Sequence, residues 1–165
     1  MIDELILPTD ISLRRVSVQD EPFLWALFGA LRADLALLPL PAAQVELLMR
    51  QQYRFQQQGY VNQFPLAESW VIEYQSIPVG KIMLDCTATG VHVIDIALVP
   101  ECRSRGIGSG VLVAIRGYVG KRAGVLSLSV DRQNIAAKRL YDRLGFVVCQ
   151  QTATHDGLQW VSSSG

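Results

Sequence analysis

Cysteines are few in this sequence, and long apolar runs are missing. The three cysteines among 165 residues, Cys86, Cys102 and Cys149, include no C-x-x-C pair. We therefore expect neither a disulfide framework nor a zinc site. No apolar run approaches the roughly 20 residues that a membrane-spanning helix needs. The N-terminal stretch MIDELILPTD carries acidic residues where a secretory signal carries basic ones, which predicts a soluble, cytoplasmic protein with no membrane partner.

The chain also has no excess of charge of either sign. It contains 15 Lys and Arg residues against 15 Asp and Glu residues, which argues against a general nucleic-acid-binding protein. The distribution is uneven, because nine basic and three acidic residues lie between Glu101 and Gly145, an excess of six, and the remainder is acidic by the same six. This pattern favours an anionic ligand near the C-terminal half and a cationic one near the N-terminal half.

Two common phosphate-binding motifs are absent. No G-x-x-x-x-G-K-[ST] sequence occurs, so a P-loop is excluded. The glycines at 106, 108 and 110 follow a predicted antiparallel meander instead of opening a βαβ unit, which disfavours a dinucleotide-binding fingerprint. A dinucleotide-dependent oxidoreductase would require Gly110 to act as a fingerprint glycine.

Hydrophobic periodicity and turn residues predict one mixed α/β domain over residues 1–165. We expect a mostly antiparallel central sheet of six to seven strands flanked by about four helices. The second helix should turn Val45, Leu48, Met49 and Phe55 inward, and the C-terminal SSSG should be frayed. The predicted strands span residues 11–18, 69–75, 80–87, 91–100, 125–130, 146–151 and 158–161, and the predicted helices span 20–38, 41–58, 107–120 and 134–144, with a loop over 60–68.

The segment VPECRSRGIGSGV, residues 99–111, joins a predicted strand to a predicted helix. The first N–H groups of a helix have no partner inside it, and the helix dipole places about half a positive charge there. A glycine-rich turn at this point lets a phosphate approach those amides closely. The segment is therefore a candidate site for a phosphate-bearing ligand.

Within this segment, Arg103, Gly106 and Gly108 form an R-x-x-G-x-G pattern. The stretch IALVPECRSRGIGSGVL closely resembles the acetyl-CoA loop of the GNAT N-acetyltransferase family, and LSLSVDRQNIAAKRLYDRLGFVV resembles the second half of that family. The resemblance is strong over about residues 91–148. It implies a GNAT-type acyl-CoA N-acyltransferase fold, acetyl-CoA as cosubstrate without a metal, a small-molecule or peptide amine as acceptor, and a possible homodimer.

The resemblance also implies which residues bind the cosubstrate. Main-chain groups of Leu98 and Val99 would hold the pantetheine arm, and Asn134 would contact it. Backbone N–H groups would bind the pyrophosphate; they belong to Arg103, Ser104, Arg105, Gly106, Ile107, Gly108 and Ser109.

Two residues are candidates for proton transfer. Tyr141 would lie near the cosubstrate sulfur and protonate the leaving thiolate, because a phenol keeps its proton at neutral pH. His92 stands eleven residues before Arg103, where acidic bases occur in some relatives, and is the first candidate base. Asp95 and water are the alternatives. Strict alternation places His92 on one face of its strand with Ile94, Ile96 and Leu98, and Asp95 on the other.

The predicted function is direct transfer of an acetyl group from acetyl-CoA to a primary amine. An alternative from another class keeps the fold and the ligand but makes the protein a non-catalytic acyl-CoA sensor or interaction module. The sequence does not identify the acceptor or the oligomeric state.

Overall fold

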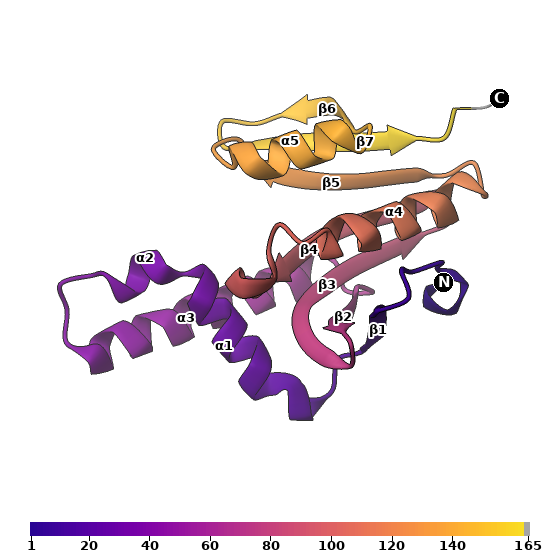
Figure 1. Ribbon diagram of the computed structural model, residues 1–165. Coiled ribbons are helices and arrows are strands. Elements are labelled where there is room, and N and C mark those ends of the chain that lie inside the picture. Colours follow the sequence, from indigo (N-terminus) through magenta and orange to yellow (C-terminus); the bar gives the residue numbers. More distant parts are fainter. Residues whose placement is uncertain (164–165) are drawn as a thin grey trace.

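The computed structural model describes residues 1–163. The predicted domain extends to residue 165, so its last two residues lie outside the described part of the chain. The same two residues are half of the SSSG stretch that was predicted to be frayed. Seven strands form one sheet (Figure 1). The strands are β1 (Ile11–Arg15), β2 (Glu68–Tyr74), β3 (Ile77–Thr87), β4 (Gly90–Leu98), β5 (Val125–Asp131), β6 (Val147–Gln151) and β7 (His155–Val161). The helices are α1 (Glu21–Leu31), α2 (Ala33–Ala36), α3 (Ala42–Gln63), α4 (Ile107–Gly120) and α5 (Ile135–Arg143), with short 3-10 turns at Ile2–Glu4, Val18–Asp20 and Pro100–Cys102.

The sheet is mostly antiparallel, which confirms the predicted fold class. Its strand order is β1-β2-β3-β4-β5-β7-β6. Among the strands of residues 1–163, only β4 and β5 pair in parallel, and α4 makes the crossover between them. The other five pairings are antiparallel.

Strands β4 and β5 pair over only part of their length. Their pairing runs from Gly90↔Val125 to Val93↔Leu128. Strand β4 nevertheless continues to Leu98 and β5 continues to Asp131. The two strands therefore part after Val93, and the end of β4 has a free edge on the side of β5.

Helices α4 and α5 cover the same face of the sheet, and both lie in front of it in Figure 1. A hydrogen bond of 2.7 Å from the Arg116 guanidinium of α4 to the carbonyl oxygen of Leu144 joins the two helices. The apolar face of α4 packs into the core, where Val111 and Ile115 are completely buried. Alternate residues of β5, Leu126, Leu128 and Val130, complete this layer.

The opposite face of the sheet carries the N-terminal helices. Phe64, at the end of α3, stacks on His92 of β4 with ring centroids 5.4 Å apart. The rest of α3 has no buried residue, and it extends with α1 and α2 as an arm to the left of the sheet in Figure 1. The end of α3 is thus the part that lies against the sheet.

Two helix predictions were wrong in detail. The expected helix over 20–38 is broken at Arg32, whose backbone (φ −113°, ψ 45°) is not helical, so that α1 and α2 are separate. Helix α3 continues to Gln63 through the first four residues of the expected loop, 60–63, because the chain contains no helix breaker between there and Pro65. Phe55, expected to face inward, is 75% exposed, since the arm has nothing packed against that side.

The predicted faces of β4 were also wrong. His92 pairs with Asp85 of β3, whereas Asp95 pairs with Met83, so Ile94 is an extra residue in β4. Such a bulge reverses the alternation of the residues beyond it. His92 and Asp95 therefore share one face, toward α3, while Ile96 and Leu98 lie on the face of α4.

Candidate active site

A pocket of about 460 Å³ lies where the N-terminal end of α4 meets α5. Most of the glycine-rich segment, which the sequence predicted to bind a phosphate-bearing ligand, lines this pocket. One face of α5 forms another wall of the pocket. The lining residues are Leu98, Arg103, Ser104, Gly106, Ile107, Gly108, Ser109, Ala136, Ala137, Arg139, Leu140 and Arg143.

The backbone amides of this segment are free to bind a ligand. Within the described residues, none of the N–H groups from 104 to 109 donates a backbone hydrogen bond, and the first helical bond of α4 runs from Gly110 to the oxygen of Gly106. Ser104 (φ +60°) and Gly106 (φ +79°) adopt left-handed backbone conformations. Alternation of this kind turns successive N–H groups toward one concave side, which binds anions. A side chain added at Gly106 would meet no atom within 4 Å, so this position opens onto free space.

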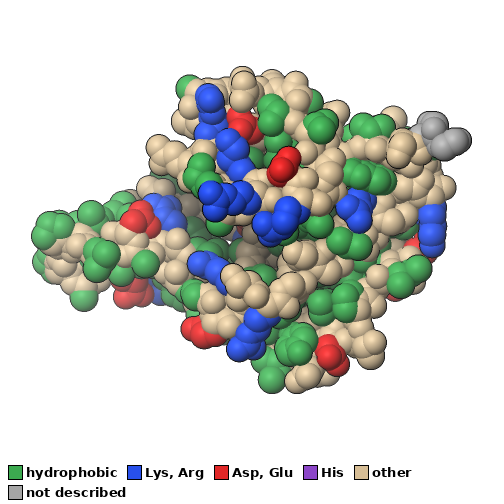
Figure 2. Space-filling view, turned by 45° about the horizontal axis from the view of Figure 1, so that its top comes forward, with side chains coloured by type: hydrophobic (Ala, Val, Ile, Leu, Met, Phe, Trp, Pro, Cys, Tyr) green, Lys and Arg blue, Asp and Glu red, His purple; other side chains and the backbone are tan. Residues whose placement is uncertain are grey.

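Three arginines supply positive charge at the pocket. Arg103 comes from the loop, while Arg139 and Arg143 come from successive turns of α5. The surface of the molecule drawn in Figure 2 has a hollow with Lys and Arg side chains on both sides of it. Arg139 and Arg143 were not among the predicted site residues, although their spacing of four residues places both on one face of a helix.

Some of the predicted cosubstrate residues do not line the pocket. Arg105 is exposed beside it. Asn134 caps α5, its side-chain oxygen accepting a 3.1 Å hydrogen bond from the N–H of Ala137. This confirms the predicted cap but occupies that oxygen. The N–H of Val99 donates to the oxygen of Val79 at 2.8 Å, and the oxygen of Val99 accepts from Cys102 at 3.0 Å.

The main chain of Leu98 is placed differently from that of Val99. Residues along an antiparallel pair alternate between those that bond to the partner strand and those that point away from it. Because Val99 bonds to Val79 of β3, Leu98 is a residue of the second kind, and its N–H and C=O face the free edge of β4. Ile96, two residues earlier, faces the same edge and was not among the predicted residues.

Gly110 has a packing role. A Cβ atom at this position would lie 3.0 Å from Pro8 and 3.3 Å from Ile11, so the N-terminal segment approaches α4 too closely for a larger residue. It does not line the pocket. The oxidoreductase interpretation, which needed Gly110 as a ligand-binding glycine, therefore has no support in the structure.

Tyr141 lies on the inward side of α5 and is 8% exposed. Its ring packs edge-on against Phe146 at 5.7 Å. Its hydroxyl takes part in none of the hydrogen bonds found among residues 1–163. Burial, with a smaller contribution from the nearby Asp95 carboxylate, raises the pKa of Tyr141 above its ordinary value of 10. The phenol is therefore protonated at neutral pH.

His92 is half-buried and held on two sides. Its Nδ1 lies 2.8 Å from the hydroxyl of Ser127, and its ring stacks on Phe64. Burial lowers the pKa of His92 below 6.5, against the opposing effect of Asp85. It lies in the stretch where β4 and β5 still pair, one pair before the strands part. The imidazole is neutral at pH 7.

Asp95 lies beyond the last β4–β5 pair. Its carboxylate accepts an ion-pair contact of 3.0 Å from the Lys81 ammonium of β3, and its side chain is 23% exposed. The same carboxylate raises the pKa values of Tyr60 on α3 and Tyr141 on α5, in addition to the larger effect of burial on each.

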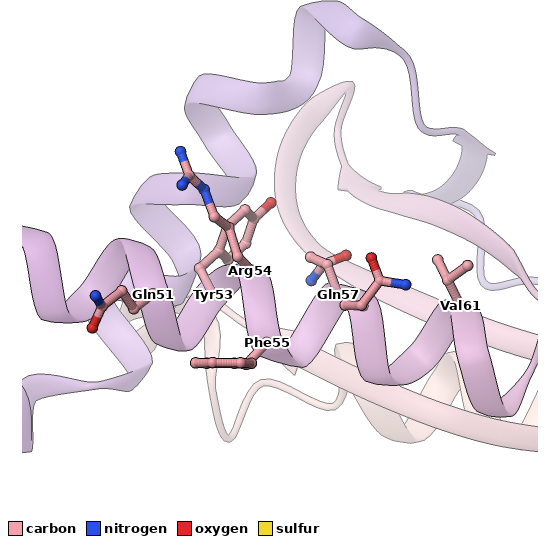
Figure 3. Close-up of a pocket in the computed structure, with 7 residues that line it drawn as sticks. Gln51, Tyr53, Arg54, Phe55, Gln57 and Val61 are labelled. Carbon is pink, nitrogen blue, oxygen red and sulfur yellow. The ribbon is translucent and has the colours of Figure 1, made fainter.

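A larger hollow of about 580 Å³ lies along α3. Only α3 lines it, with Gln51, Tyr53, Arg54, Phe55, Gln57, Gln58 and Val61. Figure 3 shows these side chains leaving the helix in different directions, so no polar groups converge on one point. The pocket between α4 and α5 is the better candidate site, because amides and arginines converge there.

The described residues contain no cluster of three or more side chains suited to hold a metal ion. The three cysteines are free thiols, and Cys86 and Cys149 are exposed. No helix within 1–163 has both the length and the apolar character needed to cross a membrane.

Comparison with known proteins identifies related sequences. Residues 48–162 match the family described as the acetyltransferase (GNAT) domain. The chain is 32% identical over 79 residues to an uncharacterized N-acetyltransferase of Methanocaldococcus jannaschii. This alignment covers 47% of the chain and spans about half, 51%, of that relative's length.

Three solved structures have a similar fold. The PaiA N-acetyltransferase of Thermoplasma acidophilum, in complex with coenzyme A, has a TM-score of 0.66 at 20% identity, covering 92% of this chain and 98% of that one. The spermidine N-acetyltransferase of Vibrio cholerae, with CoA and spermine, has a TM-score of 0.64 at 14% identity, covering 94% and 98%. The ribosomal-protein-S18-alanine N-acetyltransferase of Escherichia coli has a TM-score of 0.60 at 17% identity, covering 94% and 96%.

Proposed function

Since the chain belongs to the GNAT acetyltransferase domain family, we propose that it transfers an acetyl group from acetyl-CoA to a primary amine. Members of this family use acetyl-CoA as a cosubstrate. The observation that carries the proposal is the row of unpartnered amides from 104 to 109, opening into a pocket with three arginines. This combination fits a diphosphate, because each oxygen can accept from an amide while the arginines balance the charge.

The rest of the site fits a thioester that extends from the diphosphate along β4. The N–H and C=O of Leu98 and Ile96 face the free edge, where an extended ligand can pair with them as an added strand. An N–H on this edge can also stabilise the negative charge that develops on the carbonyl oxygen. Tyr141 then supplies a proton to the departing sulfur, since a thiol of ordinary pKa about 8.5 leaves more readily when protonated.

The acceptor proposed is a primary amine, without further identification. The similar structures include enzymes named for spermidine and for a ribosomal protein's alanine, so both small molecules and protein N-termini are acceptors within this fold. That the whole chain is one domain stays a proposal, which the continuous sheet from β1 to β7 supports. Pairing into a homodimer and the cytoplasmic location remain predictions.

A thermal unfolding assay tests the ligand. A ligand that binds only the folded protein at 100 times its dissociation constant stabilises it by about 2.7 kcal/mol. We expect acetyl-CoA to raise the melting temperature and NAD to leave it unchanged. The absence of a shift at millimolar acetyl-CoA would reject the proposal.

Release of free thiol from acetyl-CoA, measured across a panel of primary amines, tests the reaction. Turnover with at least one amine supports the transferase. Binding of acetyl-CoA without turnover on a panel of polyamines, amino acids and peptide N-termini would instead support the non-catalytic sensor.

A further inference from the structure

One buried carboxylate joins β7 to α5. Asp156 is 1% exposed, and strand alternation places it on the same face of the sheet as Leu158, the face that α5 covers. One carboxylate oxygen lies 3.0 Å from the Lys138 ammonium of α5. The other accepts a 3.1 Å hydrogen bond from the Gln151 side chain of β6 and lies 3.6 Å from Arg132, in the loop that follows β5. Three neighbouring segments are thus tied to one residue of β7.

Lys138 and the pocket lie on opposite sides of α5. Ala136 and Leu140, which line the pocket, are each two residues from Lys138 and therefore about 160° from it around the helix. The two pocket arginines, Arg139 and Arg143, lie about 100° and 140° from Lys138. A contact on the far side of the helix therefore decides which way the pocket side points.

An ion pair at this place specifies an orientation more than it adds stability. Removing two charges from water costs about as much as their attraction returns, and apolar side chains often stabilise such a place equally well. A charged hydrogen bond, however, has a defined length and direction. The Lys138 ammonium lowers the pKa of Asp156 below its ordinary value, against the effect of burial, so the carboxylate is charged at neutral pH.

The other contact that fixes α5 lies at its end. Arg116 of α4 binds the carbonyl oxygen of Leu144, one residue after the last residue of the helix. A single contact at one end sets the distance between α4 and α5 but leaves the helix free to turn about its own axis. Asp156 holds the helix near its middle, through Lys138, and so opposes this rotation.

We propose that Asp156 is a positioning residue for the acetyl-CoA site, because its contact with Lys138 sets how α5 is rotated about its axis. The rotation decides where the helix presents its two pocket arginines and the proposed acid, Tyr141. Asp156 itself does not line the pocket. The inference rests on the proposed acetyl transfer and adds to that site a residue on the far side of the helix.

A small rotation is enough to change binding. Side chains reach about 6 Å from the axis of a helix, so a rotation of about 20° displaces their ends by about 2 Å. A charged hydrogen bond to a phosphate is lost over such a distance. A displacement of about 1 Å caused by a distant substitution can lower a reaction rate about 100-fold. Loosening α5 should therefore weaken the site although every pocket residue is unchanged.

A double-mutant cycle on the Kd of acetyl-CoA tests the proposal. We expect Asp156→Asn and Arg139→Gln each to weaken binding about tenfold, the size of one charged hydrogen bond. Independent losses would multiply to about 100-fold in the double variant. A rotated α5 no longer presents Arg139 to the ligand, so we expect the double variant to lose only about 10- to 20-fold.

Two controls distinguish position from charge. Arg103 comes from the loop and does not turn with α5, so the losses in Arg103→Gln and Asp156→Asn should multiply fully. Asp142 is an exposed carboxylate on α5. Removing a negative charge by itself favours an anionic ligand, so Asp142→Asn should bind acetyl-CoA as tightly as wild type or slightly more tightly. Weaker binding in Asp156→Asn therefore has the opposite sign to its effect on charge.

An apolar pair separates positioning from stability. Asp156→Asn is expected to lower the melting temperature, because it leaves Lys138 without its carboxylate. The variant with Asp156→Val and Lys138→Met together should melt no lower than wild type, because apolar side chains can replace a buried ion pair. Its acetyl-CoA affinity should stay about tenfold weaker, because apolar contacts do not specify the rotation of the helix.

The inference is overturned if Asp156→Asn binds acetyl-CoA as tightly as wild type, or if its loss multiplies fully with that of Arg139→Gln. It is also overturned if the apolar pair regains wild-type affinity together with its melting temperature, since stability alone would then account for the effect. A wild-type protein that does not bind acetyl-CoA would reject the proposed function itself, so the two failures are distinct.

Discussion

Arg116 of α4 donates a 2.7 Å hydrogen bond to the carbonyl oxygen of Leu144, just beyond the last residue of α5. Its guanidinium also lies 5.8 Å from the ring of Trp160 on β7. Because α4 provides the amides of the pocket and α5 provides two of its arginines, this contact fixes the spacing between the two walls.

Arg116→Met should therefore weaken the site as well as the fold. Removal of a partly buried charged hydrogen bond costs about 1.5 to 3 kcal/mol of unfolding free energy. We expect this loss in urea unfolding, together with weaker acetyl-CoA binding by calorimetry. Lys121→Met, at the exposed end of the same helix, is the control and should change neither. Unchanged affinity in Arg116→Met would show that the helices hold their spacing without this contact.

Arg139 and Arg143 should contribute to binding through their charge. We expect Arg139→Gln and Arg143→Gln each to weaken acetyl-CoA binding about tenfold, the size of one charged hydrogen bond to a phosphate. The double variant should also show a smaller dependence of Kd on salt concentration. Arg54→Gln, on the distant arm, serves as the matched control. An equal loss of acetyl-CoA affinity in Arg54→Gln and Arg139→Gln would mean that the net charge of the protein, and not the position of the arginine, determines the affinity.

A side chain at Gly106 should weaken binding of the ligand more than it weakens the fold. Its φ of +79° costs an alanine about 1 to 2 kcal/mol, and the new methyl group would stand where the ligand approaches the amides. Gly106→Ala is expected to weaken acetyl-CoA binding at least tenfold beyond any loss of stability. Gly117→Ala, within α4 and with no atom near its Cβ, should instead stabilise the helix by about 0.5 to 1 kcal/mol. Thermal melts with and without acetyl-CoA separate the two effects.

Tyr141→Phe isolates the proposed acid. The phenol ring is buried and its hydroxyl has no hydrogen-bond partner in the described chain, so the variant should fold with the stability of the wild type. Loss of general acid catalysis lowers kcat by about 100-fold or more. The Kd of acetyl-CoA should not change. An active Tyr141→Phe protein would require another proton source for the sulfur.

Asp20 should make stability depend on acid pH. Two hydrogen bonds from Arg14 (2.9 and 2.8 Å) and one from the N–H of Ser17 (2.8 Å) hold the pKa of this buried carboxyl well below its ordinary value. The stabilisation is therefore complete above the unfolded-state pKa near 4 and is lost as pH falls below it. Asp20→Asn should melt about 5 °C lower than wild type at pH 7, with the difference shrinking toward pH 2. A constant difference from pH 7 to pH 2 would contradict this assignment.

The sequence predicted the part of the molecule that depends on local chemistry. The segment from 103 to 109 needs left-handed conformations and free amides at a helix start, and its glycines and position after a strand indicate both. The cap at Asn134 and the three-strand meander from β2 to β4 likewise follow from residues close in sequence.

Features that depend on distant contacts were not predicted. The bulge at Ile94 carries no glycine or proline to mark it, so alternation gave Asp95 the wrong face. Phe64, directly after α3, stacks on His92 of β4, a contact between residues 28 apart in the sequence that the local pattern does not reveal. Arg139 and Arg143 look like ordinary solvent-facing residues until α4 is placed beside α5. Their spacing indicates that both lie on one face of a helix, but only the fold shows that this face lines the pocket.

The extra residue in β4 sets which layer of helices each side chain in the second half of the strand faces. Beyond Ile94, the side chain of Asp95 lies toward α3, while those of Ile96 and Leu98 lie toward α4. Deleting Ile94 would exchange the sides of every residue on one half of the strand in a single step. On the half that moves, the side chains and the main-chain N–H and C=O groups would change direction together, so a single residue sets both the faces and the edges of this part of the strand.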